Sequence, residues 1–163
     1  MRVFVAASGA VGALVAIDQL SKWWVETTLP FQRAVDVIPF LALYRTWNEG
    51  IAFSMLAFLD DTVLAILSIA VSFILLAVWR SLDHLRLGAH VGFTLVMGGA
   101  IGNLIDRLRL GHVVDFVLVH AGNWSFAVFN LADAFVTVGA GLILLDEFLH
   151  WYRGRRGDAD PQG

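Results

Sequence analysis

Asp115 and Asp133 are the two residues of this sequence whose side chains are best suited to catalysis. Neither has a Lys or Arg at helical spacing that would explain it as half of an ion pair. Two carboxyl groups held close together cannot easily both ionise, so one keeps its proton and the other can accept a proton from water. The ionised carboxylate acts as a general base, while the protonated one hydrogen-bonds a scissile carbonyl and later protonates the leaving amine. Such a pair titrates as a unit, so neither role is assigned to a particular aspartate.

Other catalytic chemistries have little support in the sequence. There is no H-E-x-x-H zinc motif and no G-x-S-x-G nucleophile motif. The absence of cysteine removes disulfides, thiol nucleophiles and thiolate metal sites. The five histidines lack the tight spacing of metal ligands, so we expect neither a metal nor a cofactor.

Two rival functions use other polar residues. A serine peptidase could use Lys22 as the base and Ser54 or Ser125 as the nucleophile, but Lys22 is explained more simply by an ion pair. A proton-coupled carrier would also hold acids inside a membrane, at successive depths. The inner halves of the apolar stretches are nearly free of acids until Asp146 and Glu147, which argues against a carrier.

The composition places these residues in a membrane protein. Of 163 residues, 58% are hydrophobic and 15% are charged, whereas soluble domains are roughly 45–50% apolar. The chain has room for about one domain with four spans of roughly 20 residues each. Its net charge is -3 and it has no long basic segment, so nucleic acid is not an expected partner.

Four apolar stretches predict an all-α membrane protein with four transmembrane helices, at about 3–25, 62–79, 87–105 and 127–149. Arg2 before the first stretch leaves a cleaved signal peptide as an alternative. Residues 1–152 are expected to form one integral membrane domain, followed by a disordered cytoplasmic tail at 153–163. Alternating patterns at 34–38 and 41–47 predict short strands, and hence a small β-containing cradle outside the cytoplasm between the first two helices.

The distribution of basic residues predicts the orientation. Six of the eleven basic residues lie on the side that holds both termini: Arg2, two arginines in 80–86 and three in the tail. Four lie on the other side, and a Lys/Arg excess marks the cytoplasmic face. We therefore expect both termini to be cytoplasmic.

In this orientation the polar residues of the spans converge on the outer membrane face. They are Asp18 and Lys22 in the first span, Asn103, Asp106 and Arg107 in the third, Asn130 and Asp133 in the fourth, and Asp115 in the connection before it. A fourth helix that starts near Ala127 would hold Asp133 about six residues along, or roughly 9 Å from its start. That depth suits a hydrated pocket between helices.

Simpler roles stay open for several of these residues. Asp18 and Lys22 could form an i, i+4 ion pair, and Asp106 could pair with Arg107 or Arg109. The two asparagines could be interhelical hydrogen-bond partners, and the G-x-x-x-G match at 98–102 could serve helix packing alone.

Five ordered sequence blocks carry a resemblance to a known family. They are DQLSK at 18–22, NEGIAF at 48–53, GGAIGNLIDR at 98–107, VVDF at 113–116 and FNLAD at 129–133. Together they resemble the lipoprotein signal peptidase family, also called signal peptidase II, up to about Tyr152.

The resemblance implies a function and a set of site residues. It implies an aspartic endopeptidase of the bacterial inner membrane that acts at the periplasmic face and cuts diacylglyceryl-modified prolipoproteins before the lipidated cysteine. We expect the protein to be a monomer. Membrane lipid is its other implied partner. The catalytic residues would be Asp115 and Asp133. Residues that bind substrate or support the site would be Asp18, Lys22, Asn48, Gly50, Asn103, Arg107 and Asn130.

Overall fold

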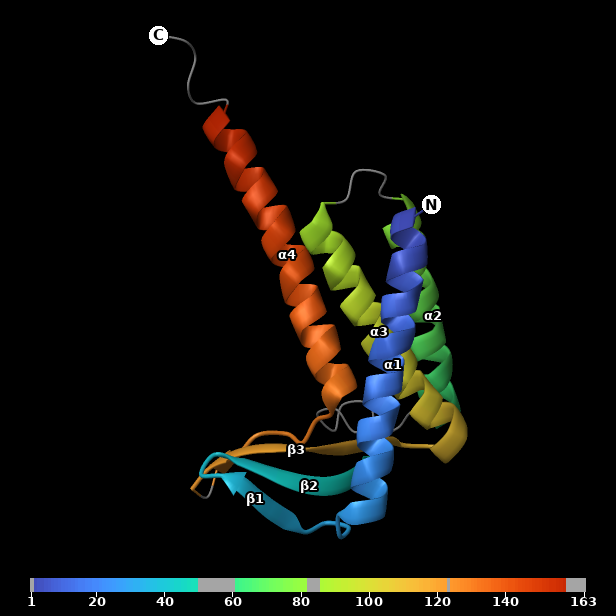
Figure 1. Ribbon diagram of the computed structural model, residues 1–163, viewed down its shortest axis with the longest axis vertical. Coiled ribbons are helices and arrows are strands. Elements are labelled where there is room, and N and C mark those ends of the chain that lie inside the picture. The colour runs from blue at the N-terminus through green and yellow to red at the C-terminus, as the bar shows by residue number, and fades with distance from the viewer. Residues whose placement is uncertain (1, 50–60, 82–85, 123, 158–163) are drawn as a thin grey trace.

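A computed structural model describes residues 2–49, 61–81, 86–122 and 124–157. Four helices lie side by side, and a small antiparallel sheet crosses one end of the bundle (Figure 1). The elements in chain order are α1 (Arg2–Thr28), β1 (Ala34–Ile38), β2 (Leu41–Asn48), α2 (Asp61–Ser81), α3 (Leu87–Leu110), β3 (Val113–Ala121), β4 (Trp124–Ser125) and α4 (Leu131–Gly157). Helix α1 begins and α4 ends on the side away from the sheet.

The four helices occupy the four apolar stretches predicted from the sequence, with different ends. Within the described residues, only α3 is long and apolar enough to cross a membrane by length and composition. Part of α2, Ile69–Arg80, is a shorter apolar helical stretch. Helix α4 continues to Gly157, so it includes five residues of the segment expected to be disordered. The Arg155 guanidinium lies 4.5 Å from the centre of the Trp151 ring, and basic side chains suit the C-terminal end of a helix.

Helix α4 begins later than expected because the chain before it pairs with β3. Phe129 and Val117 exchange backbone hydrogen bonds of 2.7 and 3.1 Å. The helix therefore starts at Leu131, and Asp133 is its third residue. The predicted position about six residues into the helix is wrong.

The sheet has the order β1-β2-β3-β4, and all its neighbouring strands are antiparallel. Strands β1 and β2 confirm the two strands predicted between the first two helices. Strands β3 and β4 were not predicted, so the cradle is built from two connections rather than one. The segment that forms β3 is largely apolar and lacks the alternation that marks a half-buried strand.

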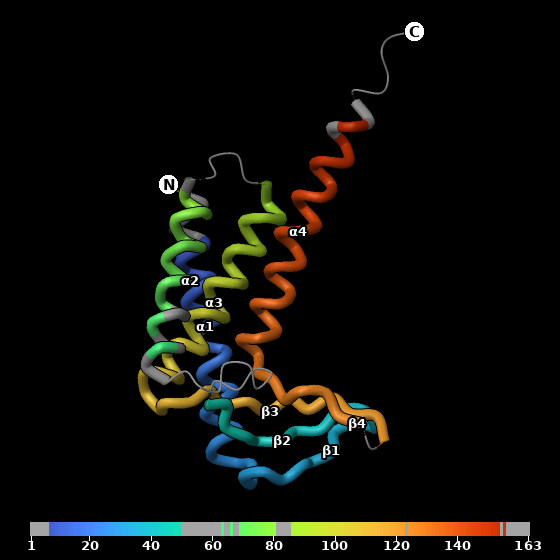
Figure 2. The backbone as a smooth tube through the Cα atoms, turned by 180° about the vertical axis from the view of Figure 1, so that it is seen from behind, coloured from blue at the N-terminus to red at the C-terminus, as the bar shows by residue number. Residues whose placement is uncertain are grey.

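Helix α3 is the centre of the bundle and contacts each of the other three helices. Its glycines allow close approach: a Cβ on Gly92 would lie 2.7 Å from the carbonyl oxygen of Gly139 in α4, and a Cβ on Gly98 would lie 2.7 Å from the Cβ of Leu14 in α1. Helix α4 leans away from the others as it leaves the sheet, as Figure 1 and Figure 2 show from opposite sides. A Cβ on Gly99 would clash with the carbonyl oxygen of Ala132, so α3 also lies close to the start of α4 beside the sheet.

Two contacts attach the sheet to α1. Val25 packs in a buried cluster with Val114 and Phe116 of β3. Arg45 of β2 donates hydrogen bonds of 2.9 and 3.3 Å to the carbonyl oxygens of Glu26 and Leu29 at the end of α1. These contacts hold β2 and β3 against the end of α1.

Candidate active site

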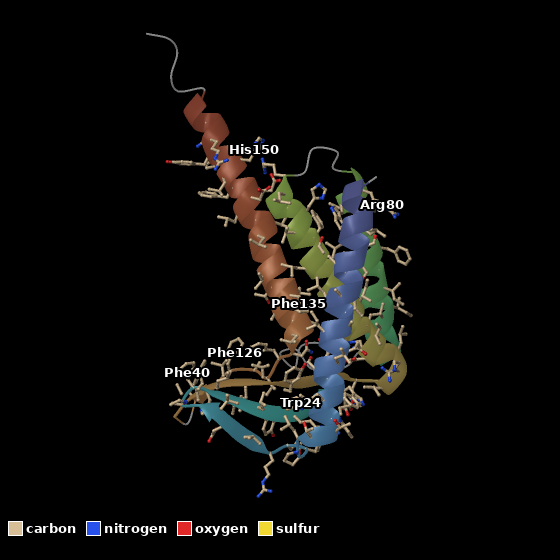
Figure 3. All side chains as sticks on the ribbon, viewed as in Figure 1. Trp24, Phe40, Arg80, Phe126, Phe135 and His150 are labelled. Carbon is tan, nitrogen blue, oxygen red and sulfur yellow. The ribbon has the colours of Figure 1, made fainter. Side chains whose placement is uncertain are left out.

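The first turn of α4 is closed by two reciprocal hydrogen bonds. Asn130 precedes the helix, and its Oδ1 accepts a hydrogen bond of 3.0 Å from the backbone N–H of Asp133. The backbone N–H of Asn130 donates in return to Asp133 Oδ2 at 3.1 Å. This arrangement is a capping box, and it fixes the Asp133 carboxylate at the positive end of the helix dipole. Phe135 in Figure 3 marks the same end of α4, next to the sheet.

Asp115 lies on β3 and is buried, with 2% of its surface exposed. Its Oδ2 accepts a hydrogen bond of 2.9 Å from Asn48 Nδ2 at the end of β2, and its Oδ1 accepts one of 2.6 Å from Asn130 Nδ2. Antiparallel pairing sets Asn48 opposite Val113, which brings its side chain within reach of this carboxylate. Both oxygens of Asp115 therefore accept hydrogen bonds from amide groups.

Asn103 of α3 completes the environment of Asp133. Its Nδ2 donates to Asp133 Oδ1 at 2.8 Å, and its Oδ1 accepts from Asn130 Nδ2 at 3.2 Å. The two aspartates, which lie on a strand and on the helix that follows it, are thus joined through shared amide groups.

A buried ion-pair cluster lies next to this network. Lys22 Nζ lies 2.8 Å from Asp18 Oδ2, 2.8 Å from Asp106 Oδ2 and 2.9 Å from Asn103 Oδ1. The i, i+4 ion pair considered for Asp18 and Lys22 is therefore present. Asp106 forms its ion pair with Lys22, across to another helix, rather than with either nearby arginine.

The two acids of the cluster also accept hydrogen bonds from the backbone of the site. Asp18 Oδ1 accepts from the N–H of Ala132 at 3.0 Å, and Asp106 Oδ2 accepts from the N–H of Val114 at 3.2 Å. Ala132 and Val114 directly precede Asp133 and Asp115 in the chain. The cluster therefore anchors both segments that carry the aspartates.

Two contributors were missing from the set of site residues predicted from sequence. Asp106 was expected only as one of the converging polar residues and as a possible partner of Arg107 or Arg109, and no role was predicted for Gln19. Gln19 Nε2 donates to Asp106 Oδ1 at 2.7 Å and to the carbonyl oxygen of Gly102 at 3.2 Å. The available signal was their position inside the blocks at 18–22 and 98–107.

The remaining predicted residues separate into three cases. Arg107 lines a pocket together with Asp133. Gly50, and the possible nucleophile Ser54, lie outside the described residues. Ser125 is exposed on β4, which pairs with the far end of β3 from Asp115. With Lys22 held between two acids, the Ser/Lys alternative has no support in the described part of the chain.

Two pockets border the aspartate pair. The larger, of about 370 Å³, lies between α2, α3 and α4 and is lined by Val71, Ala100, Asn103, Arg107, Asp133, Val136 and Thr137. The smaller, of about 230 Å³, lies on the sheet side and is lined by Thr46, Trp47, Asn48, Glu49, Asp115, Ala127 and Val128. Each aspartate therefore borders a different pocket.

Burial raises the pKa of Asp115 from 3.8 to about 6. The hydrogen bond from Asn48 lowers this pKa, the nearby Asp133 carboxylate raises it, and Asn130 and Lys22 lower it. Asp115 thus holds a proton over a wider pH range than an exposed aspartate. Among the described residues, no three His, Asp or Glu side chains are grouped so that they could hold a metal ion.

Comparisons with known proteins identify the family of this chain. The family model described as Signal peptidase (SPase) II matches residues 10–149. The lipoprotein signal peptidases of Brucella ovis and Brucella abortus are each 57% identical to this chain over 141 residues, which cover 86% of this chain and 88% of each relative.

Two solved structures have a similar fold. Both are described as a bacterial membrane enzyme studied by the in meso method, at 2.3 and 1.9 Å resolution. The first has a TM-score of 0.78 and 30% identity, covering 88% of this chain and 87% of that one. The second has a TM-score of 0.77 and 30% identity, covering 86% and 90%.

Fold, site and comparisons together define a membrane-bound aspartic peptidase. The chain belongs to the signal peptidase II family, which confirms the resemblance found in the five sequence blocks.

Proposed function

We propose that Asp115 and Asp133 are the catalytic carboxylates with which this family member removes signal peptides from prolipoproteins. The observation that carries the proposal is the position of Asn130, which donates a hydrogen bond to each carboxylate, at 2.6 and 3.1 Å. The two carboxylates are also close enough for the charge of Asp133 to raise the pKa of Asp115, which suits a pair that acts on one peptide bond.

The reaction uses the pair in two protonation states. The ionised carboxylate takes a proton from a water molecule, and the water oxygen attacks the carbonyl carbon of the scissile bond. The protonated carboxyl hydrogen-bonds the carbonyl oxygen and stabilises the tetrahedral intermediate. A proton is then delivered to the leaving amine as the carbon–nitrogen bond breaks, and one proton remains on the pair. The raised pKa of Asp115 favours it as the member that holds this proton at rest.

Asn103 and Lys22 position the pair. Lys22 is an obligatory donor, so the oxygen of the Asn103 amide must face it and the amide nitrogen must face Asp133. Arg107 lines the pocket beside Asp133, where its guanidinium would contact the substrate backbone. By resemblance, Gly50 is assigned with Asn48 to the residues that support the site.

The larger pocket suits the apolar part of the substrate. Its walls between α2, α3 and α4 include Val71, Ala100 and Val136, with Asp133 among the polar lining residues. A signal peptide is an apolar segment, and a diacylglyceryl group belongs in lipid. We infer that the substrate is a diacylglyceryl-modified prolipoprotein, cut just before the lipidated cysteine.

We infer that all four helices span the bacterial inner membrane, with both termini cytoplasmic and the sheet and site at the periplasmic face. Large apolar side chains that face outward support this: Phe73 and Ile74 of α2 are 69% and 61% exposed, and Leu144 of α4 is 70% exposed. Such a surface is favourable in lipid and unfavourable in water. We further propose that the protein acts as a monomer and that the tail after α4 is cytoplasmic.

The catalytic assignment is tested with Asp115→Asn and Asp133→Asn, made separately. Each should abolish cleavage of a lipid-modified prolipoprotein while the protein stays in the membrane. The matched control is Asp36→Asn, because the side chain of Asp36 on β1 is 79% exposed and it lines neither pocket. Substantial cleavage by either dyad variant would disprove the assignment. A parallel assay with unlipidated substrate, which should be cut poorly, tests the substrate class.

The orientation is tested by labelling introduced cysteines, since the chain has none of its own. A cysteine at Asp36 should react from outside with an impermeant thiol reagent. A cysteine at Ser81, at the other end of the bundle, should react only after the membrane is permeabilised. The opposite pattern would invert the topology.

A further inference from the structure

The smaller pocket contains an acidic residue that the reaction does not use. Glu49 lines this pocket together with Asp115 and Trp47. Its side chain is exposed, and none of the ion pairs between described residues includes it. The charge of Glu49 is therefore available to a bound chain.

The two pockets differ in a way that gives the substrate a direction. The larger is walled by apolar side chains of three helices, whereas the smaller lies on the sheet side and includes Thr46, Asn48 and Glu49. The part of a prolipoprotein before the cut is apolar and lies in the membrane, and the part after the cut is polar and leaves it. The polar pocket beside Asp115 thus matches the residues that follow the cut.

Glu49 directly follows a residue that contacts Asp115. Asn48 contacts Asp115 at 2.9 Å, and Glu49 is the next residue, one Cα spacing of about 3.8 Å further on. An extended substrate advances about 3.3 Å per residue, so the first two residues after the cysteine would pass Glu49. Trp47, which is 45% exposed, adds an aromatic surface to the same pocket. A carboxylate beside an aromatic ring attracts a Lys or Arg side chain.

Resting on the proposed function, we propose that Glu49 is a specificity-determining residue that favours substrates with a basic residue at the first or second position after the lipid-modified cysteine. It contacts the departing part of the substrate and takes no part in the proton transfers. Acidic residues at the same positions are disfavoured by repulsion from Glu49.

The test uses three diacylglyceryl-modified prolipoprotein peptides that differ only at these two positions, which hold Lys, Gln or Glu. The wild-type protein should cleave the Lys peptide with a kcat/KM about two- to fivefold above that for the Glu peptide, as expected of an exposed ion pair. High salt should reduce the preference because it screens exposed charges.

Variants separate the charge of Glu49 from other causes. Glu49→Gln should remove the preference, Glu49→Lys should reverse it, and the control Asp36→Asn should keep it. Equal cleavage of the three peptides by the wild-type protein, or an unchanged preference in Glu49→Lys, would overturn the inference and leave the proposed function standing. Failure to cleave any of the three would overturn the proposed function, and the inference with it.

Discussion

Asn130 donates a hydrogen bond to each aspartate of the pair, from its side-chain Nδ2 to Asp115 Oδ1 at 2.6 Å and from its backbone N–H to Asp133 Oδ2 at 3.1 Å. The same residue caps α4 through its Oδ1. The start of a helix and the geometry of the proposed catalytic pair therefore both depend on one residue.

The two roles of Asn130 can be separated by substitution. Asn130→Ala removes both the cap and the donor to Asp115. It should lower the stability by about 1 kcal/mol and the cleavage rate roughly 10- to 100-fold, the effect of leaving a buried carboxyl oxygen without its hydrogen bond. Asn130→Ser keeps a capping hydroxyl and should restore the stability but not the rate. Thermal unfolding in detergent and a cleavage assay measure the two effects, and full activity in Asn130→Ser would contradict the role proposed for the side-chain amide.

Removal of Lys22 should destabilise the protein strongly. Lys22→Met would leave the carboxylates of Asp18 and Asp106 buried, close together and without their cation. Loss of one partner from a buried ion pair costs roughly 3–5 kcal/mol. The triple variant Asp18→Asn, Lys22→Met, Asp106→Asn contains no charge in this cluster and should recover most of the stability. Unfolding temperatures in detergent compare the variants, and an unchanged value for Lys22→Met would show that the cluster contributes little.

The pH dependence of stability should differ between the wild-type protein and Asp115→Asn. Near pH 4 and below, Asp115 is largely protonated in the folded state. In the unfolded chain, Asp115 ionises as the pH rises past its ordinary pKa of 3.8. Because the folded-state pKa is raised to about 6, the contribution of Asp115 to stability is lost as pH rises between these values. This loss in the free energy of unfolding is at most roughly 3 kcal/mol.

Asp115→Asn lacks this titration. Its stability relative to the wild-type protein should therefore increase from pH 4 to about pH 6 and stay constant above that. Unfolding measured at several pH values tests this expectation, and parallel curves for the two proteins would argue against a raised pKa at Asp115.

A methyl group at Gly99 should disturb the site from outside it. A Cβ there would clash with the carbonyl oxygen of Ala132 and lie 2.9 Å from Val136 Cγ2, so the first turn of α4 would have to move. Gly99→Ala should cost roughly 1–3 kcal/mol and reduce cleavage. Gly12→Ala is the control, because nothing lies within 4 Å of the added methyl group. Equal behaviour of the two variants in unfolding and cleavage assays would rule out this packing constraint.

Several features of the site could be predicted from the sequence. The four apolar stretches located the helices, and the alternation at 34–38 and 41–47 located β1 and β2. Asp115 and Asp133 were selected because no ion pair explained them. Strand β3 was missed because a buried strand and a buried helix have similar apolar sequences over a short run.

The ion-pair partner of Asp106 could not be predicted from the sequence either. Helical spacing suggested the arginines that follow it, but the folded chain pairs it with Lys22 of α1. Spacing reports contacts within one helix, whereas this contact depends on how closely α1 approaches α3. Gly98, which faces Leu14, allows that approach.

The sequence by itself determined the class of protein and the helices, and it singled out the residues proposed to do the chemistry, because hydropathy and side-chain type are local properties. The tertiary structure decided that Asp115 lies on a strand and that Asp133 is part of a helix cap. It also decided that Asn130 contacts both aspartates. Those facts depend on the register between β2 and β3 and on the closeness of α3 and α4. Both arise from packing between distant segments, which no local pattern in the sequence specifies.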